Sequence, residues 1–223
     1  MKRIVLFFCW ISLLSACSED DEGSDVLLFI GKEYVSLKVG QEAIYQIDSI
    51  LYNEFTGRIN VVSLQQREYI SRTEMDAENR ETFIVEIHTR AADSLPWHLN
   101  RITKRNLTGY RYEVLDNNVI SVPLVFPIVI DKKWNANVLN TLITKEYKYK
   151  SVNEVFINDS MRYDSTVSVL QFEEENLIEK LYEKETYAAD VGLIFREHNE
   201  IETEFNGDIR SGFKSEMKLI SIK

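Results

Sequence analysis

Apolar and polar residues alternate along much of this 223-residue chain, and this alternation constrains its fold more than any other feature. Phe83, Val85 and Ile87, for example, fall on one side of an extended segment. Glu86 and His88 fall on the other side. A period of two is typical of half-buried β-strands. We expect strands over residues 34–39, 43–47, 58–69, 83–90, 97–105, 110–115, parts of 119–130, 144–152, 154–157, 165–174, 177–187, 193–205 and 212–222.

Short polar turns separate these segments, and about ten strands joined in this way suggest an antiparallel meander. Sheets of that length curl, and closure into a barrel removes their exposed edges. The fold class that we predict is therefore mainly β, a long-stranded antiparallel meander curled into a barrel or half-barrel. Pro123 and Pro127 prevent 119–130 from being a central strand throughout.

The segment 177–187 allows two interpretations. Leu177 and Leu181 are four residues apart, which suits one face of a helix. The segments on both sides are predicted strands, and we therefore favour a strand here as well.

The first residues have the organisation of a secretory signal peptide. Lys2 and Arg3 precede the apolar run Ile4–Leu14, and the small residues Ser15 and Ala16 follow it. The run is about half the length of roughly 20 apolar residues that a membrane-spanning helix needs. We expect a signal peptide at 1–16, an acidic tether at 17–32 and a single β domain at 33–223, since no repeat or low-complexity linker divides the rest.

The end of the signal peptide, Leu14-Ser15-Ala16-Cys17, resembles the lipobox of bacterial lipoproteins. By that resemblance Cys17 becomes the lipid-modified N-terminus, and its acyl chains anchor the protein to a membrane. The acidic run after Ser18 resembles the surface-export signal of Bacteroidota lipoproteins, although acidic runs are also typical of solvated tethers. The resemblance implies an outer-membrane lipoprotein, facing the cell surface or, alternatively, the periplasm.

Three further patches, taken together, resemble a group of Bacteroidota lipoproteins of unassigned function. They are the Phe126-Pro127 pair with Trp134 downstream, the segment 165–175, and the run 187–194, Tyr-Ala-Ala-Asp-Val-Gly-Leu-Ile. Ala136 and Asp190 stand where that group tends to have glycine, a difference that we expect to affect turns. The resemblance implies no catalytic residues.

Charge and cysteine content exclude several functions. The formal net charge is −10, and loss of Lys2 and Arg3 with the signal peptide would make it −12. An acidic chain without a basic patch argues against a nucleic-acid partner. With Cys9 removed and Cys17 lipidated, the domain has no thiol for a disulfide, a metal site or a nucleophile.

No residue pattern indicates catalysis or a cofactor. His88, His98 and His198 are the histidines of the chain, and we interpret them as surface residues, so we expect neither a metal site nor an enzyme. Glu173-Glu174-Glu175 is interpreted as a solvated turn. Trp97 and Trp134 could line a cavity, but aromatic residues in strands more often belong to the core.

Four serines lie in a short pattern, Asp followed by Ser and then an apolar residue or Thr, that resembles the O-glycosylation sequon of Bacteroidota. They are Ser49, Ser94, Ser160 and Ser165. Asp-Ser pairs also start turns, so both interpretations stay open.

Taken together, the sequence suggests a non-enzymatic envelope lipoprotein whose curled sheet binds a small apolar ligand or a protein partner. The alternative is a structural or accessory subunit of an outer-membrane complex. An exposed apolar patch would favour the alternative, and an internal cavity would favour the binding module.

Overall fold

The structure, a computed structural model, describes residues 31–158 and 161–223. In these residues the chain forms a twelve-stranded antiparallel sheet with the strand order β6-β5-β4-β3-β2-β1-β12-β11-β10-β9-β8-β7. The elements are η1 (Lys32–Tyr34), β1 (Glu42–Tyr52), β2 (Ile59–Met75), β3 (Glu81–Arg90), β4 (His98–Leu107), β5 (Arg111–Asp116), β6 (Val119–Val125), β7 (Lys133–Asn135), β8 (Glu146–Asn158), β9 (Met161–Glu175), β10 (Glu179–Ala188), β11 (Gly192–Thr203) and β12 (Ile209–Ile222). Each strand pairs with its neighbours in sequence along the two halves of the sheet, and the pairing of β1 with β12 joins the halves.

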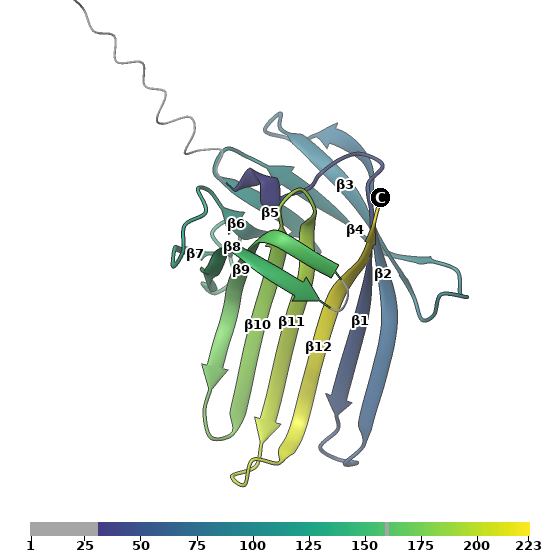
Figure 1. The fold of residues 1–223 in the computed structure, drawn as a ribbon, viewed down its shortest axis with the longest axis vertical. Helices are drawn as coiled ribbons and strands as arrows, with labels where there is room; N and C mark the ends of the chain where they lie inside the picture. Colours follow the sequence, from purple (N-terminus) through teal and green to yellow (C-terminus); the bar gives the residue numbers. More distant parts are fainter. Residues whose placement is uncertain (1–30, 159–160) are drawn as a thin grey trace, which may run out of the picture.

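The sheet curls into a nearly closed barrel, which confirms the predicted fold class (Figure 1). Its two edges, at β6 and β7, are connected by hydrogen bonds outside the regular ladder. The backbone N–H of Val122 donates to the carbonyl of Ala136 at 2.9 Å, and the indole N–H of Trp134 donates to the carbonyl of Val122 at 2.8 Å. The Tyr149 hydroxyl both donates to the carbonyl of Val125, at 2.7 Å, and accepts from its N–H, at 2.9 Å.

Proline explains why β6 lies at an edge. Pro123 lies within β6, where it has no N–H to donate to a second neighbouring strand. The same short strand ends at Val125, just before the Phe126-Pro127 pair. The sequence prediction that this segment is not a central strand is confirmed.

The predicted strand at Tyr34–Val39 is wrong. Tyr34 ends the short helix η1, and the following residues cross one end of the barrel without joining the sheet (Figure 1). Val35 and Leu37 pack against buried core residues at that end. The alternation was real, but it reflects a segment that covers the barrel end with one side and faces solvent with the other.

Two other local predictions are resolved by the backbone. The predicted strands at 144–152 and 154–157 fall in one continuous strand, β8, which begins only at Glu146. Within it Asn153 adopts a positive φ of 59° beside irregular pairing with β9. The strand interpretation of 177–187 is confirmed, since β10 occupies most of that segment. Asp190 has a φ of 62°, a left-handed conformation that glycine adopts more easily, in the turn before β11.

The hairpin of β8 and β9 bends across the outer face of β11 and β12 (Figure 1). Phe156 of this hairpin contacts Phe195 of β11 with ring centroids 5.6 Å apart. Phe195 is only 8% exposed as a result, although it points away from the barrel interior.

The largest buried cluster fills the covered end of the barrel. It contains Tyr34 and the fully buried Leu124, Tyr149, Val167 and Val169. Within residues 31–158 and 161–223, we find no helix with the length and apolar character needed to cross a membrane.

Candidate functional site

A cavity of about 360 Å³ lies inside the barrel. The crossing segment, with Tyr34 and Val35, lines it at the covered end. Arg101 and Asp116 line it near the opposite end, where the hairpins turn. A volume of this size is at the lower end of the range for small-molecule sites.

An ion pair between β2 and β4 forms part of the wall. The guanidinium of Arg105 donates to Glu68 at 2.5 Å, and the side-chain amide of Gln66 donates to the same carboxylate at 3.0 Å. Burial alone would lower the pKa of Arg105, but the charge and hydrogen bond of Glu68, together with Tyr112 and Tyr45, raise that pKa above its usual value. Arg105 therefore stays protonated in the barrel interior.

A second ion pair faces the first from β10 and β11. The Arg196 guanidinium donates to Glu185 at 2.6–2.7 Å, and the Tyr187 hydroxyl donates to the other oxygen of that carboxylate. Burial, together with the charge of Glu185, raises the pKa of Tyr187 well above its usual value, so the phenol stays protonated. The Arg196 side chain lines the cavity and is 44% exposed, so the cavity has room for water beside it.

Three polar atoms of the lining have no hydrogen-bond partner among the residues that the structure describes. They are Oγ1 of Thr103, Nε of Arg105 and Oδ1 of Asp116. Thr103 is only 2% exposed, and the other carboxylate oxygen of Asp116 accepts from Arg101 at 2.9 Å. Leaving a buried polar atom unpaired costs about 1–3 kcal/mol. Each of these atoms is itself covered by neighbouring atoms, so it can bond to a molecule in the cavity only after a local side-chain movement.

The chemistry of the lining is thus polar, whereas the sequence suggested an apolar ligand. Charged, hydroxyl and amide side chains come from nine different strands: β1, β2, β4, β5, β6, β8, β9, β10 and β11. The sequence did not reveal them, because Glu68, Arg105 and Glu185 alternate with other polar residues and look like solvent-facing side chains. A weak signal was present in β10, which has charged residues on both of its faces and no apolar face to bury.

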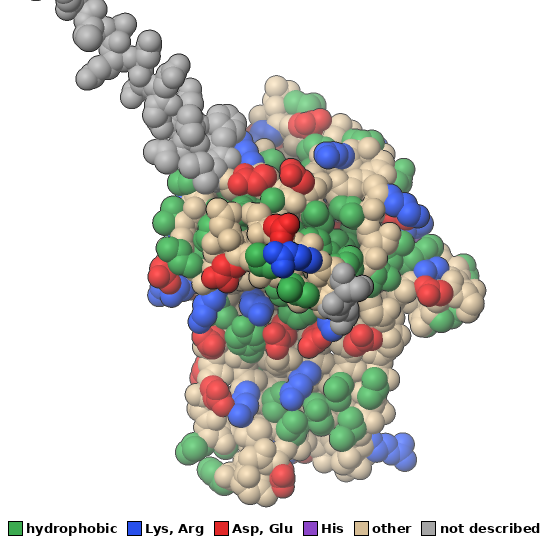
Figure 2. All heavy atoms as spheres, in the orientation of Figure 1, with side chains coloured by type: hydrophobic (Ala, Val, Ile, Leu, Met, Phe, Trp, Pro, Cys, Tyr) green, Lys and Arg blue, Asp and Glu red, His purple; other side chains and the backbone are tan. Residues whose placement is uncertain are grey.

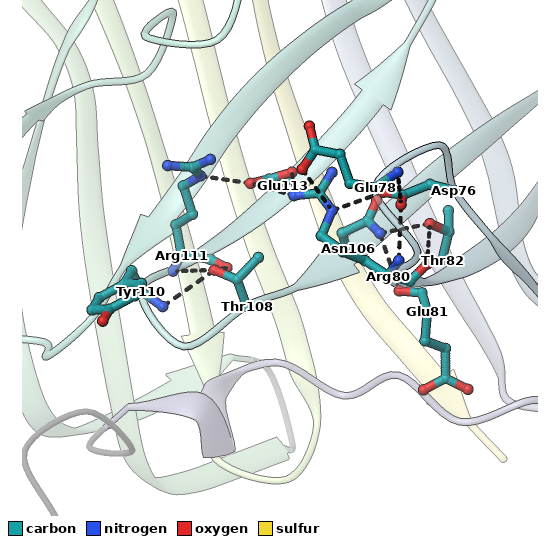
Figure 3. Close-up of polar contacts among 10 residues, drawn as sticks. All are labelled: Asp76, Glu78, Arg80, Glu81, Thr82, Asn106, Thr108, Tyr110, Arg111 and Glu113. Atoms are coloured by element: carbon teal, nitrogen blue, oxygen red, sulfur yellow. Dashed lines mark hydrogen bonds and ion pairs between the residues drawn. The ribbon is translucent and has the colours of Figure 1, made fainter. Parts of the chain in front are cut away.

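A second polar cluster lies on the outer side, beside a hollow of about 550 Å³ between the crossing segment and the ends of β3 to β5 (Figure 3). Glu113, 3% exposed, lies between Arg80 at 3.2 Å and Arg111 at 2.5 Å. Arg80 also donates to Asp76 at 2.8 Å. Both arginines are already paired with carboxylates, and these ion pairs connect the turn between β2 and β3 to β5. We therefore assign the cluster a structural role.

The residues predicted as modification sites are spread over the chain. Cys17 and Ser160 lie outside the described residues. Ser94 is exposed in the turn between β3 and β4. Ser49 points into the barrel and its hydroxyl bonds to that of Ser215 at 2.8 Å, while the Ser165 hydroxyl bonds to that of Tyr34 at 2.9 Å. Of the three predicted modification sites within the described residues, Ser94 therefore has the hydroxyl that is most accessible to a modifying enzyme.

Neither tryptophan considered for the cavity lines it. Trp134 packs on Tyr149 with ring centroids 4.6 Å apart, as the core interpretation predicted. Trp97 lies between the guanidinium groups of Arg67 and Arg90, at 5.2 and 4.3 Å from its ring. The Glu173–Glu175 run is exposed, but its interpretation as a turn is wrong, because all three residues belong to β9 and pair with β10.

The three histidines have different surroundings. His98 is exposed, and Nε2 of His88 lies 3.8 Å from Glu86 on the outer face. His198 lines the cavity, and its Nε2 lies 2.9 Å from Glu200 and 3.5 Å from Glu183. His198 is partly exposed, as the surface interpretation predicted, but cross-strand pairing also brings it next to two carboxylates, which the sequence did not predict.

The fold and cavity define a β-barrel protein with a polar interior. No family model matches the chain, and no curated protein matches it either. Among solved structures, it is similar to a protein described as a "putative lipoprotein" from Parabacteroides distasonis ATCC 8503, with 11% identity and a TM-score of 0.41 over 85% of this chain and 98% of the other. At that level of similarity, we base no conclusion about family or function on the match.

Proposed function

We propose that this protein is an outer-membrane lipoprotein, anchored through Cys17, whose barrel binds a small polar ligand without transforming it. The charged and hydroxyl side chains that line the cavity, with the Glu68–Arg105 and Glu185–Arg196 ion pairs among them, are the observation that carries the proposal. The lipobox-like Leu14–Cys17 segment and the acidic residues after it support the anchor and a position on the cell surface.

The lining indicates the chemistry of the ligand. Arg105 and Arg196 still offer N–H donors, and Glu68 and Glu185 offer acceptors, but each charge is already balanced by its partner. A ligand with several hydroxyl groups or with charges of both signs matches such a wall, since it can bond donors and acceptors without adding net charge. A fatty acid or other apolar chain would instead leave buried polar atoms unpaired.

A thermal-shift comparison tests this ligand class. We expect members of a panel of sugars, polyols and zwitterions to raise the melting temperature, and matched apolar compounds to leave it unchanged. Thr103→Val should weaken the response to the best polar compound, whereas Thr144→Val, at an exposed threonine, should not. Stabilisation by apolar compounds alone, or equal responses of both variants, would contradict the proposal.

The anchor has a separate test. Cys17→Ala should abolish incorporation of labelled fatty acid and release the protein from the membrane fraction. Proteolysis of intact cells distinguishes a surface position from the periplasmic alternative. Unchanged labelling of the Cys17→Ala variant would refute lipidation at this residue.

A second candidate, an accessory subunit of an outer-membrane complex, is favoured by one feature. Three hairpin turns at the same end of the barrel expose large apolar side chains: Phe55 is 94% exposed, Phe205 87% and Leu177 80% (Figure 1). The turns are neighbours, since the strands run in the order β2-β1-β12-β11-β10-β9. On the face shown in Figure 2, charges of both signs are otherwise interspersed.

Cross-linking in cells tests this candidate. A partner that binds the turns should be captured reproducibly by the wild type and lost when Phe55, Leu177 and Phe205 are all replaced by serine. Equal capture by both proteins would exclude the turns as the contact.

A further inference from the structure

At the edge of the cavity lies a set of three side chains that no part of the proposed function uses. Glu183 of β10 pairs directly across the ladder with His198 of β11, and Glu200 follows two residues later on the same face. The three residues can each supply one ligand atom, and these atoms all lie within 4.8 Å of one another. We propose that Glu183, His198 and Glu200 form a binding site for a divalent transition-metal ion, with Zn²⁺ as the best fit.

The distances support tetrahedral coordination. With Zn–N and Zn–O bonds of about 2.0–2.2 Å, two ligand atoms of a tetrahedral site lie roughly 3.3–3.6 Å apart. Nε2 of His198 lies 3.5 Å from Oε1 of Glu183 and 2.9 Å from Oε1 of Glu200. Both distances from His198 are close to tetrahedral spacing. The two carboxylate oxygens, which lie within 4.8 Å of each other, would have to approach by at most about 1.2 Å to complete the site.

Neighbouring groups hold two of the ligands in place. Phe213 contacts the His198 ring edge-on with centroids 4.8 Å apart. Lys145 donates to Oε2 of Glu183 at 2.6 Å, which leaves Oε1 directed at the histidine. Such outer contacts orient metal ligands, although the positive charge of Lys145 also reduces the attraction for a cation.

The ligand set and exposure indicate the kind of site. One imidazole with two carboxylates suits Zn²⁺ better than Ca²⁺ or Mg²⁺, which take oxygen ligands. The side chains of Glu183, His198 and Glu200 are 22%, 35% and 53% exposed, so an ion can enter from solvent. Three protein ligands leave a fourth position open, and Glu183 and His198 line the cavity into which it would face.

The same geometry also suits a protonated His198 paired with both carboxylates, so the test must distinguish a metal ion from a proton. Untagged residues 17–223 with Cys17→Ser, which removes the only thiol, are titrated with ZnCl₂ by calorimetry. We expect one Zn²⁺ per chain. His198→Ala should weaken binding at least about 100-fold, since loss of even an outer-shell partner costs 10–100-fold.

Two further variants complete the test. His98→Ala, at an exposed histidine outside the set, should bind like the wild type. Glu200→Gln keeps the shape of the side chain and should weaken binding at least about 10-fold without loss of folding. Co²⁺ in place of Zn²⁺ should give the intense visible absorption of tetrahedral coordination in the wild type and not in His198→Ala.

Absence of one-to-one binding by the wild type, or equal weakening by His98→Ala and His198→Ala, would overturn the metal site. The assay contains no organic ligand, so its failure leaves the thermal-shift test of the proposed function unaffected.

Discussion

One hydroxyl group makes two of the hydrogen bonds that close the barrel, and its removal should have a large effect. Tyr149 is fully buried on β8, and its hydroxyl bonds to both the N–H and the carbonyl of Val125 at the end of β6. Tyr149→Phe removes both bonds and leaves two backbone groups unpaired. At about 1–1.5 kcal/mol for each bond, the loss is about 2–3 kcal/mol of unfolding free energy. For a domain of this size that corresponds to a decrease of about 4–12 °C in melting temperature.

Thermal unfolding followed by circular dichroism measures this effect. Tyr110→Phe is the matched control, because Tyr110 is 64% exposed near the start of β5, and surface substitutions of this kind change stability by less than about 0.5 kcal/mol. Hydrogen exchange should also quicken at Val122, whose N–H bonds to Ala136 across the same junction. A melting temperature for Tyr149→Phe within 1 °C of the control would refute the account of how the sheet closes.

Three further predictions concern the backbone and pH. Gly212→Ala should lower the free energy of unfolding, measured with denaturant, by at least about 3 kcal/mol. Gly212 has a φ of 112°, and a Cβ there would lie 1.9 Å from the carbonyl oxygen of Glu200. A loss below about 1 kcal/mol would contradict this close approach. The hydrogen bond from the backbone N–H of Arg80 lowers the pKa of the Asp76 carboxylate. The ionised carboxylate therefore stabilises the folded protein above about pH 4, and this stabilisation is lost as pH falls further. The stability difference between wild type and Asp76→Asn should therefore shrink towards pH 2, and a constant difference would argue against it. Burial raises the pKa of Tyr112 to about 12, so the protonated phenol stabilises the folded protein fully below about pH 10, and this contribution is lost as pH rises to about 12. In a spectrophotometric titration, Tyr112→Phe should lack one of the phenols that ionise late in the wild type.

Local sequence patterns predicted the strands well, because burial on one side of a sheet requires a period of two. Phe83, Val85 and Ile87 lie in β3 as expected. The same pattern failed at Val35 and Leu37, since a segment covering the barrel end also buries alternate residues. A periodicity therefore shows which side chains are buried, but not whether the backbone joins a ladder.

The contents of the barrel could not be predicted from the sequence, since they depend on pairings between distant residues. Glu68 and Arg105 are 37 residues apart, and they meet because β2, β3 and β4 pair in one register. His198 meets Glu183 only through the register of β10 with β11. A shift of one residue in either ladder would turn these side chains to the outer face.

The central claim, that the barrel encloses a solvent-accessible cavity, is tested most directly by thiol labelling. Residues 18–223 contain no cysteine, so single-cysteine variants report one position each. Ser121→Cys places a thiol on the cavity wall, and Val167→Cys places one in the fully buried core. We predict that a small charged methanethiosulfonate reagent modifies the folded Ser121→Cys protein and leaves Val167→Cys unmodified. Equal protection of both thiols in folded protein would contradict the account.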